Sequence, residues 1–323
     1  MNSPNVLIAD IGGTNARFAL RCDSAPYFSA VETLKCADFP HIFDAIDRYI
    51  ELTQPGEVSH FCFAVAGPVQ DQRIDFLNNH WSVSADELQA RYQLERAVLL
   101  NDFVAIAYSL PALGEDDLMR VGDCQKPLAK DNFAYCVIGP GSGLGIAGLR
   151  AIDGHLTAID TEGGHSGFAP LNQRQRDVLA VLQERYHRVS NERLISGPGL
   201  ENLYMALNQI EGSGGLPKTA QEIATDDKDP LCQEAVSLFL EVLGQVAGDA
   251  ALSLGAFDGV FIGGGITPRF PRRLQNSKFR QGFADKGRYC ETMQDVPTWL
   301  ISHSNPGLLG ASVFARQECR WRA

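Results

Sequence analysis

The chain has 323 residues, and its 39 acidic and 28 basic side chains give a formal net charge of −11 at pH 7. That acidic balance disfavours a nucleic-acid surface, which needs a basic stripe, but it permits a nucleotide held by backbone N–H groups and a divalent cation. The length fits about two domains, and the eight cysteines contain no C-x-x-C pair, which favours scattered reduced thiols over a zinc site.

The distribution of apolar residues also bears on two classes, secreted proteins and membrane proteins. No basic n-region precedes the first motif at Asp10, so we expect no signal peptide and a cytoplasmic location. The most apolar long stretch, 236–254, contains Glu241, Asp249 and two glycines. We expect it to form a buried helix and not a membrane span.

Strand-like and helix-like segments alternate along the chain. Periodicity predicts a hairpin over 7–20, a helix over 41–51, strands over 60–66 and 95–100, and a helix over about 102–110. A second round begins near 133 with another hairpin, a helix over about 175–189, a long helix over 231–254 and a strand over 259–262. The segment 211–229 is expected to be a surface connection. This repetition predicts two similar α/β lobes with a cleft between them.

Two glycine-rich turns lie between apolar strand-like runs, Asp10-Ile-Gly-Gly-Thr-Asn-Ala-Arg17 and Gly139-Pro-Gly-Ser-Gly-Leu-Gly145. Glycine permits positive φ and lacks the Cβ that would keep phosphate oxygens away, so such turns can direct several N–H groups at one anion. Neither turn has the spacing of a dinucleotide or Walker motif. Each alone is equally well explained as an ordinary hairpin. Together, with Asp10 and Thr14 placed to reach a metal and a phosphate, they indicate a nucleotide site.

Asn101-Asp102 stands where an apolar strand meets the next helix, at the carboxyl end of a strand where open α/β sheets bind ligands. Two interpretations of Asp102 are open. It caps the helix, as Asp and Asn both can, or it serves as a general base. A third glycine cluster, 263–265, also follows a strand and would allow a planar ligand such as adenine to approach closely.

A second polar group is the turn Glu162-Gly-Gly-His165, in which a carboxylate and an imidazole could bind neighbouring hydroxyls of a sugar. A structural role for His165 is equally open. Zinc is disfavoured, because no H-E-x-x-H motif occurs and no cysteine lies near His165 in the sequence. From first principles Glu192 and Asn78 are indistinguishable from other polar surface residues.

Seven segments, in order, resemble signatures of the ATP-dependent bacterial glucokinases, which belong to the hexokinase and actin-like ATPase superfamily. They are the two glycine turns, 101–103, 162–165, 196–200, 259–265 and 305–310. The resemblance implies an α/β fold with two lobes of the actin-like ATPase (ribonuclease H-like) type and a central cleft. It also implies a small domain of 1–111 plus about 306–323, a large domain of 112–305, and a homodimer.

The same resemblance implies transfer of the ATP γ-phosphoryl group to the 6-hydroxyl of glucose, with Asp102 removing the hydroxyl proton. Asp10 would orient Mg²⁺ through water. The implied sugar-binding residues are Asn78, Asn101, Asp102, Glu162, His165 and Glu192. The implied ATP-binding residues are Ala9, Asp10, Ile11, Gly12, Gly13, Thr14, Asn15, Arg17, Gly139, Gly141, Ser142, Gly143, Gly263, Gly264 and Gly265.

The chain departs from the family pattern in three places. Thr161 stands where the family often has glycine, Ser166-Gly167 follow the Glu-Gly-Gly-His run, and Pro140 lies inside the second glycine turn. The cysteine-rich zinc motif of the related repressor and sugar-kinase branch is absent from this sequence. Two alternatives stay open beside glucose phosphorylation. One is a kinase for another hexose or an N-acetylhexosamine, and the other is a regulator that binds sugar and ATP without turnover.

Overall fold

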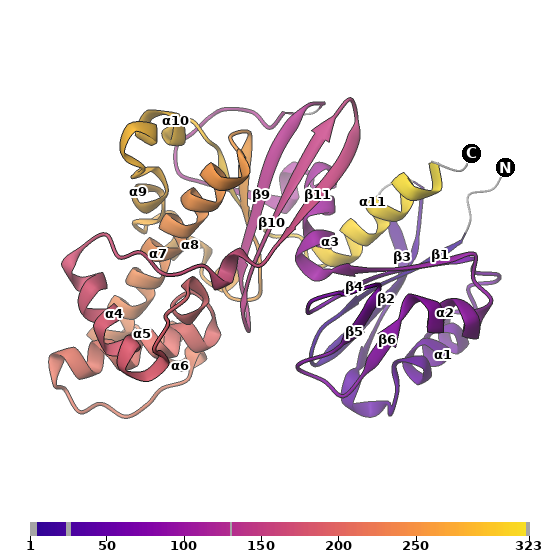
Figure 1. The fold of residues 1–323 in the computed structure, drawn as a ribbon, viewed down its shortest axis with the longest axis horizontal. Coiled ribbons are helices and arrows are strands. Elements are labelled where there is room, and N and C mark those ends of the chain that lie inside the picture. The colour runs from indigo at the N-terminus through magenta and orange to yellow at the C-terminus, as the bar shows by residue number, and fades with distance from the viewer. Residues whose placement is uncertain (1–4, 24–26, 130, 321–323) are drawn as a thin grey trace. The chain divides into compact units, whose positions relative to one another are not determined.

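The computed structural model describes residues 5–23, 27–129 and 131–320, and its contacts divide the chain into two compact units. Unit 1 takes the N-terminal part up to Gly114 together with the C-terminal segment from His303. Unit 2 is Glu115–Ser302. Figure 1 shows the two ends of the chain, indigo and yellow, in the same unit.

Unit 1 is built on a five-stranded sheet in the order β3-β2-β1-β4-β7. β1 pairs antiparallel with β2 and parallel with β4, which pairs parallel with β7. The strands of this unit are β1 Val6–Ile11, β2 Asn15–Arg21, β3 Phe28–Lys35, β4 His60–Val65, β7 Arg96–Asn101 and the separate pair β5 Arg73–Asp75 and β6 Ser82–Ser84; its helices are α1 Ile42–Thr53, α2 Ala85–Tyr92, α3 Asp102–Ser109 and α11 Pro306–Arg320.

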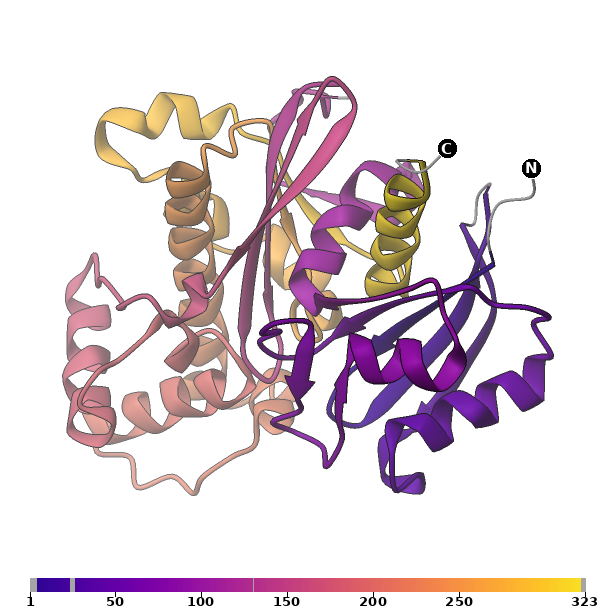
Figure 2. The ribbon, with the colours of Figure 1, turned by 45° about the vertical axis from the view of Figure 1, so that its right-hand side comes forward.

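Helices cover both faces of this sheet. Side chains of α1 and α2 share one buried cluster with Phe61 and Phe63 of β4. On the other face α11 packs against α3, β1 and β4, with Leu308 and Leu309 buried; both views show the yellow helix beside α3 (Figures 1 and 2). Strands covered on both faces have continuous apolar runs, as β1 and β4 do.

Unit 2 repeats this strand arrangement and adds one strand. Its sheet order is β11-β10-β9-β12-β13-β8, in which β9, β10 and β11 are antiparallel neighbours and β9, β12 and β13 are parallel. The strands are β8 Leu118–Val121, β9 Phe133–Pro140, β10 Leu144–Ile152, β11 His155–Thr161, β12 Gly259–Ile262 and β13 Thr298–Ile301; the helices are α4 Gln173–Tyr186, α5 Gly197–Glu211, α6 Ala220–Thr225, α7 Pro230–Leu254, α8 Pro271–Gln275, α9 Phe279–Ala284 and α10 Cys290–Gln294. The expectation of two similar α/β halves is confirmed.

The long helix α7 forms part of the core of unit 2. It is the one helix in the described part of the chain that is long and apolar enough to cross a membrane, yet 78% of its apolar window is buried. Gly244 and Gly248 lie so close to the backbone carbonyls of Phe279 and Phe283 that a Cβ at either glycine would clash. The expected buried helix is therefore present, and it packs tightly against α9.

One expectation about unit 2 was wrong in detail. The helix expected to reach 189 ends at Tyr186, because His187 adopts a φ of 56° and closes the helix. Val189, expected on its apolar face, is buried outside the helix, where its carbonyl accepts a hydrogen bond from Phe168 N. The segment 211–229 is mostly exposed, as expected of a surface connection, and it also contains the short helix α6, whose N-cap Thr219 forms a capping box with Glu222.

Candidate active site

The first glycine turn connects β1 to β2 in unit 1. It is closed by a hydrogen bond of 2.9 Å from Gly12 N to Asn15 O, and Cys36 N donates to Thr14 O at 2.9 Å. A Cβ on Gly13 would lie 2.7 Å from the Cβ of Asn78. Glycine is thus required at 13 by close packing, and the structure places the predicted sugar residue Asn78 directly against the predicted phosphate turn.

Asn79 fixes this contact, and the sequence analysis passed over it. Its Nδ2 donates to Gly12 O at 3.1 Å and its Oδ1 accepts from Trp81 N at 2.8 Å. Trp81 is buried and donates its indole N–H to Phe39 O at 3.1 Å. These hydrogen bonds hold the loop that carries Asn78 and Asn79 against Gly12 on one side and Phe39 on the other. In the sequence, Asn78 and Asn79 precede Trp81. That pattern does not show which of the two amide side chains contacts the Gly12 carbonyl.

Asp10 lies on β1 opposite Arg17 of β2, with 3.9 Å between its Oδ2 and the Arg17 guanidinium. Its side chain is 24% exposed. Burial raises the pKa of the Asp10 carboxyl, and the charge of Arg17 acts in the opposite direction. A Cβ on Gly307, near the start of α11, would lie 2.9 Å from Asp10 Cγ. The C-terminal glycine motif therefore makes room for this carboxylate.

These features fit a divalent cation beside Asp10. An ionised carboxylate that has lost hydration gains from a positive charge, and Mg²⁺ commonly keeps waters and takes only one or two protein carboxylates. The one grouping of three possible metal ligands in the described residues lies elsewhere, at Asp226, Asp229 and Cys232. Lys218 Nζ already occupies its centre, 2.9 Å from Asp226, 2.7 Å from Asp229 and 3.3 Å from Cys232 Sγ.

Asn101 and Asp102 take different roles at the junction of β7 and α3. Asn101 is the N-cap: its Oδ1 accepts from Phe103 N at 2.9 Å and Val104 N at 3.2 Å. Its Nδ2 donates to Gly67 O at 3.2 Å. Asp102 is the first helical residue and is partly exposed, and its Oδ1 accepts from Phe103 N at 2.9 Å. The interpretation of Asp102 as the helix cap is wrong, because Asn101 supplies the cap.

The second glycine turn, in unit 2, packs against Glu192. A Cβ on Gly143 would lie 2.6 Å from Glu192 Oε2, which accepts a hydrogen bond of 3.0 Å from Leu144 N. Glu192 belongs to a 3₁₀ turn, Asn191–Arg193, and is partly buried. Glu192, which the sequence does not distinguish from other surface acids, therefore packs against the β9–β10 hairpin and holds it through Leu144 N.

Two further glycine segments meet the same hairpin. Gly197 N donates to Gly141 O at 2.8 Å, next to the N-cap Ser196 of α5. Gly264 has a φ of +80° and abuts the backbone of Gly139 and Pro140, whereas no atom lies within 4 Å of a Cβ placed on Gly265. Gly263 N donates to Ile138 O at 2.8 Å. All three glycine clusters of unit 2 therefore adjoin, and Gly264 serves this packing.

Glu162 immediately precedes the 3₁₀ turn Gly163–His165, and His165 is the last residue of that turn, directly after β11. Glu162 Oε2 lies 3.8 Å from His165 Nε2, and the side chains are 69% and 58% exposed. Thr161 Oγ1 donates to Ile146 O at 2.8 Å and accepts from Gly163 N at 3.2 Å. Threonine at this position, a departure from the family pattern, thus ties the turn to β10. The two polar groups are side by side and accessible.

The structure brings the predicted residues together in two sets, one in each unit. In unit 1 Asp10 lies beside Arg17 and Gly13 contacts Asn78, while Asn101 and Asp102 mark the end of β7 and the start of α3. Unit 2 joins the 139–145 turn to Glu192 and to 263–264, and pairs Glu162 with His165. The structure describes no contact for Ala9, Ile11 or Ser142 that bears on ATP, and the binding roles of all the predicted ATP and sugar residues stay predictions.

Comparison with known proteins gives one answer over almost the whole chain. A family model described as Glucokinase matches residues 7–318. The chain is 41% identical over 314 residues to a glucokinase of Chromohalobacter salexigens, covering 97% of this chain and 98% of the relative. It is 38% identical over 315 residues to a glucokinase of Hahella chejuensis, covering 97% of each. A crystal structure of glucokinase from an Antarctic psychrotroph has a TM-score of 0.88 at 32% identity, over 98% of this chain and 99% of that one.

Proposed function

The chain belongs to the glucokinase family, whose members are ATP-dependent hexose kinases, and from that premise we propose how its own residues perform the reaction. The substrate is glucose. Its 6-hydroxyl oxygen attacks the γ-phosphorus of ATP, the bond from that phosphorus to the bridging oxygen of ADP breaks, and the hydroxyl proton passes to the Asp102 carboxylate. The products are glucose 6-phosphate and ADP.

The assignment of Asp102 as the general base rests on the different roles of Asn101 and Asp102 at the start of α3. Asn101 is the N-cap of α3, and its Oδ1 accepts from both Phe103 N and Val104 N, so the shared bond from Phe103 N to Asp102 Oδ1 is not needed for capping. Asp102 lies at the carboxyl end of a parallel strand, the edge where open α/β sheets bind ligands. A carboxylate at that edge can accept a proton, which the amide of asparagine cannot.

The nucleotide would be held mainly by backbone. We propose that the 12–14 and 141–143 turns direct N–H groups at its phosphates and that Gly265, whose surroundings are open, permits close approach of the adenosine part. Asp10 would hold Mg²⁺, and the cation would supply charge stabilisation for the phosphoryl group. Phosphoryl transfer depends on positioning and electrostatics, so backbone turns and a single carboxylate suffice.

The sugar would be recognised by hydrogen bonds to its other hydroxyls. Glu162 and His165 are adjacent and accessible, as such recognition requires. Glu192 has its Oε2 engaged by Leu144 N, which orients its second oxygen for a hydroxyl. Asn101 and Asn78 complete the proposed set. The homodimer and the cytoplasmic location are parts of the same proposal, and size-exclusion chromatography with light scattering tests the former.

The first experiment measures sugar-dependent ADP release from ATP and Mg²⁺ in the wild type and in Asp102→Asn. We expect strong release with glucose and a loss of about 10² to 10⁴ in turnover in Asp102→Asn, because the general base is removed. The helix should persist, since its cap at Asn101 is untouched. Asp86→Asn, an exposed acid in the first turn of α2, is the matched control and should keep full activity.

The alternatives give different results in the same assay. Release with mannose, fructose, N-acetylglucosamine or N-acetylmannosamine in place of glucose would keep the mechanism and change the substrate. ATP binding without sugar-dependent release would favour a regulator. Turnover near the wild-type level in Asp102→Asn would remove the base assignment.

A further inference from the structure

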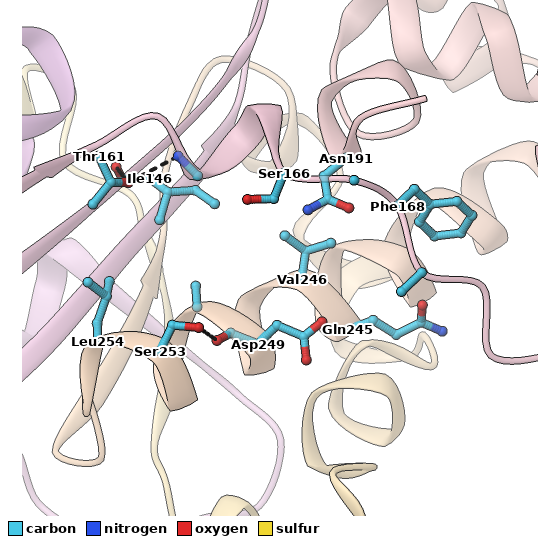
Figure 3. A pocket seen from close by; sticks show the side chains of 14 residues that line it. Ile146, Thr161, Ser166, Phe168, Asn191, Gln245, Val246, Asp249, Ser253 and Leu254 are labelled. Atoms are coloured by element: carbon cyan, nitrogen blue, oxygen red, sulfur yellow. Dashed lines mark hydrogen bonds between the residues drawn. The ribbon is translucent and has the colours of Figure 1, made fainter. Parts of the chain in front are cut away.

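Glu192, one of the residues proposed to bind the sugar, is held through its backbone as well as through its side chain. It lies in the 3₁₀ turn Asn191–Arg193, and its Oε2 accepts from Leu144 N at 3.0 Å. Asn191, the first residue of this turn, lies beside Ser166 on one side of a cavity of about 330 Å³ (Figure 3), and its N donates to Ser166 O at 2.9 Å. The position of the Glu192 carboxylate therefore depends on how firmly the backbone of this turn is held.

Two polar side chains, the N-cap of α5 and a residue of its second turn, hold this backbone. Ser196 Oγ donates to Glu192 O at 2.8 Å and accepts from Gly199 N at 3.0 Å, so it fastens the turn and also caps the helix. Asn202 Nδ2 donates to Arg193 O at 3.0 Å. The carbonyls of two consecutive residues are thereby fixed, and with them the direction in which the Glu192 side chain leaves the backbone.

Asn202 has a defined partner on each end of its amide. Its Oδ1 accepts from the Tyr186 hydroxyl at 2.9 Å, and this bond leaves the NH₂ group to face the Arg193 carbonyl. The Tyr186 ring in turn lies against the Arg193 guanidinium, with 4.2 Å from the ring centroid to Cζ. The amide of Asn202 is therefore aimed at the turn by the last residue of α4.

Packing alone does not explain an asparagine at this position. Asn202 is 4% exposed and lies within a helix, where leucine would fill a similar space, favour the helix more and bury no amide. The group that gains from the amide is the Arg193 carbonyl, in the turn that presents Glu192. A small displacement of Glu192 is enough to weaken a contact with a sugar hydroxyl, because hydrogen bonds weaken steeply as their geometry departs from the optimum.

We propose that Asn202 is a positioning residue of the sugar site, which acts on the sugar through Glu192 and does not touch it. This inference rests on the proposed function, since it takes Glu192 as a sugar-binding residue. Loss of the Asn202 amide should therefore weaken sugar binding while leaving the chemical step largely intact, because the proposed base Asp102 belongs to unit 1.

The test is a double-mutant cycle of Asn202→Leu and Glu192→Ala, measured as glucose-dependent ADP release. In the wild-type background Asn202→Leu should raise the KM for glucose about threefold to tenfold, equivalent to one weakened hydrogen bond, and change kcat less than about twofold. In the Glu192→Ala background the same substitution should leave the KM unchanged, because the side chain that Asn202 positions is absent. The matched control is Tyr204→Phe, which removes another buried polar group from α5, a hydroxyl that donates to Asp229 at 3.4 Å, and should keep the wild-type KM.

The outcomes distinguish this inference from the proposed function. If Glu192→Ala raises the KM for glucose and Asn202→Leu raises it by the same factor in both backgrounds, the sugar contact of Glu192 stands and the positioning role is overturned. If Glu192→Ala leaves the KM unchanged, the sugar contact itself is wrong and the inference fails with it. Asn202→Asp keeps the shape and the acceptor for Tyr186 but, when ionised, has no donor for Arg193 O. A wild-type KM in Asn202→Asp would overturn the positioning role even if Asn202→Leu does not fold.

Discussion

At the scale of single residues, the partly buried carboxyl of Asp10 makes the folding stability of the protein depend on pH. Burial raises the pKa of its carboxyl, so folding without ligand penalises the ionised form relative to the unfolded chain. The stability that Asp10 contributes is therefore fully present below its unfolded pKa of about 4 and is lost as pH rises through the raised folded pKa. At neutral pH the ionised carboxylate therefore opposes folding, and the proposed cation would compensate its charge.

The expected result is that Asp10→Asn stabilises the protein without ligand at pH 7 and abolishes most activity. The amide fits the same space beside Gly307 and carries no charge. The difference in melting temperature between the variant and the wild type should appear above about pH 4 and stop growing once pH exceeds the folded pKa of Asp10.

Calorimetry from pH 4 to pH 8 measures this difference, with Asp38→Asn at an exposed position as the control. Addition of Mg²⁺ and ATP should raise the melting temperature of the wild type more than that of Asp10→Asn. A variant less stable than the wild type at pH 7 would show that ionised Asp10 is favourable in the fold.

The adjacent residues Asn101 and Asp102 illustrate a feature that the sequence could not predict, namely which of them caps the helix. Asn and Asp are equally good N-caps, so the sequence could not assign Asn101 or Asp102 to that task. The assignment depends on which residue has non-helical backbone angles, and Asn101 has a φ of −56° and a ψ of 145°. Glu192 is a similar case, because its contact with Leu144 joins residues 48 positions apart.

At the scale of elements, the glycine clusters of unit 2 form one packed assembly, and its members differ in what they require. Gly264 combines a positive φ with backbone neighbours that leave no room for a Cβ, whereas Gly265, the next residue, has open surroundings. The pair therefore offers a matched comparison within one motif.

Gly264→Ala should lower the free energy of unfolding by about 2 kcal/mol or more, through backbone strain and the clash with the 139–140 backbone. Gly265→Ala should change it by less than about 0.5 kcal/mol. Urea unfolding measures both values. Equal destabilisation of the two variants would contradict the proposed packing role of Gly264.

The elements predicted well were those with a clear repeat or a clear boundary. The 7–20 hairpin, the strand over 259–262 and the 231–254 helix were confirmed to within a few residues. β3 was missed because most of its side chains are exposed and give no alternating pattern. α2 and α6 were missed although Ser84 with Glu87 and Thr219 with Glu222 form capping boxes, a signal that the sequence contains.

At the scale of the whole molecule, the repeated strand order is the main architectural fact. Both sheets place an antiparallel three-stranded part beside parallel strands, and each glycine turn lies in the hairpin at the centre of this order. The fold is that of the actin-like ATPase class, as in the related glucokinase of known structure. The cleft expected between the lobes stays a prediction, as do the sugar and ATP contacts that depend on it.

Unit 1 depends on a helix from the far end of the chain. Deletion of the residues after Ser302 removes α11, which covers β1, β4 and α3 with Leu308 and Leu309. We expect amides of β1 and β4 to lose protection from hydrogen exchange, while those of β9 and β12 in unit 2 keep theirs, because local stability follows local packing. A peptide of residues 303–320 should restore protection. Unchanged protection of β1 and β4 after the deletion would refute this dependence.

Unit 1 is discontinuous in sequence, and this determines the order in which its parts are synthesised. The strands and first helices of unit 1 leave the exit tunnel first, but the helix that covers one face of their sheet is made last. All of Glu115–Ser302 is synthesised in between, so unit 2 can complete its core while unit 1 still presents an uncovered apolar surface. Until α11 has been made, this apolar surface of the unit 1 sheet is a place where a chaperone could bind, and the packing of α11 then covers it.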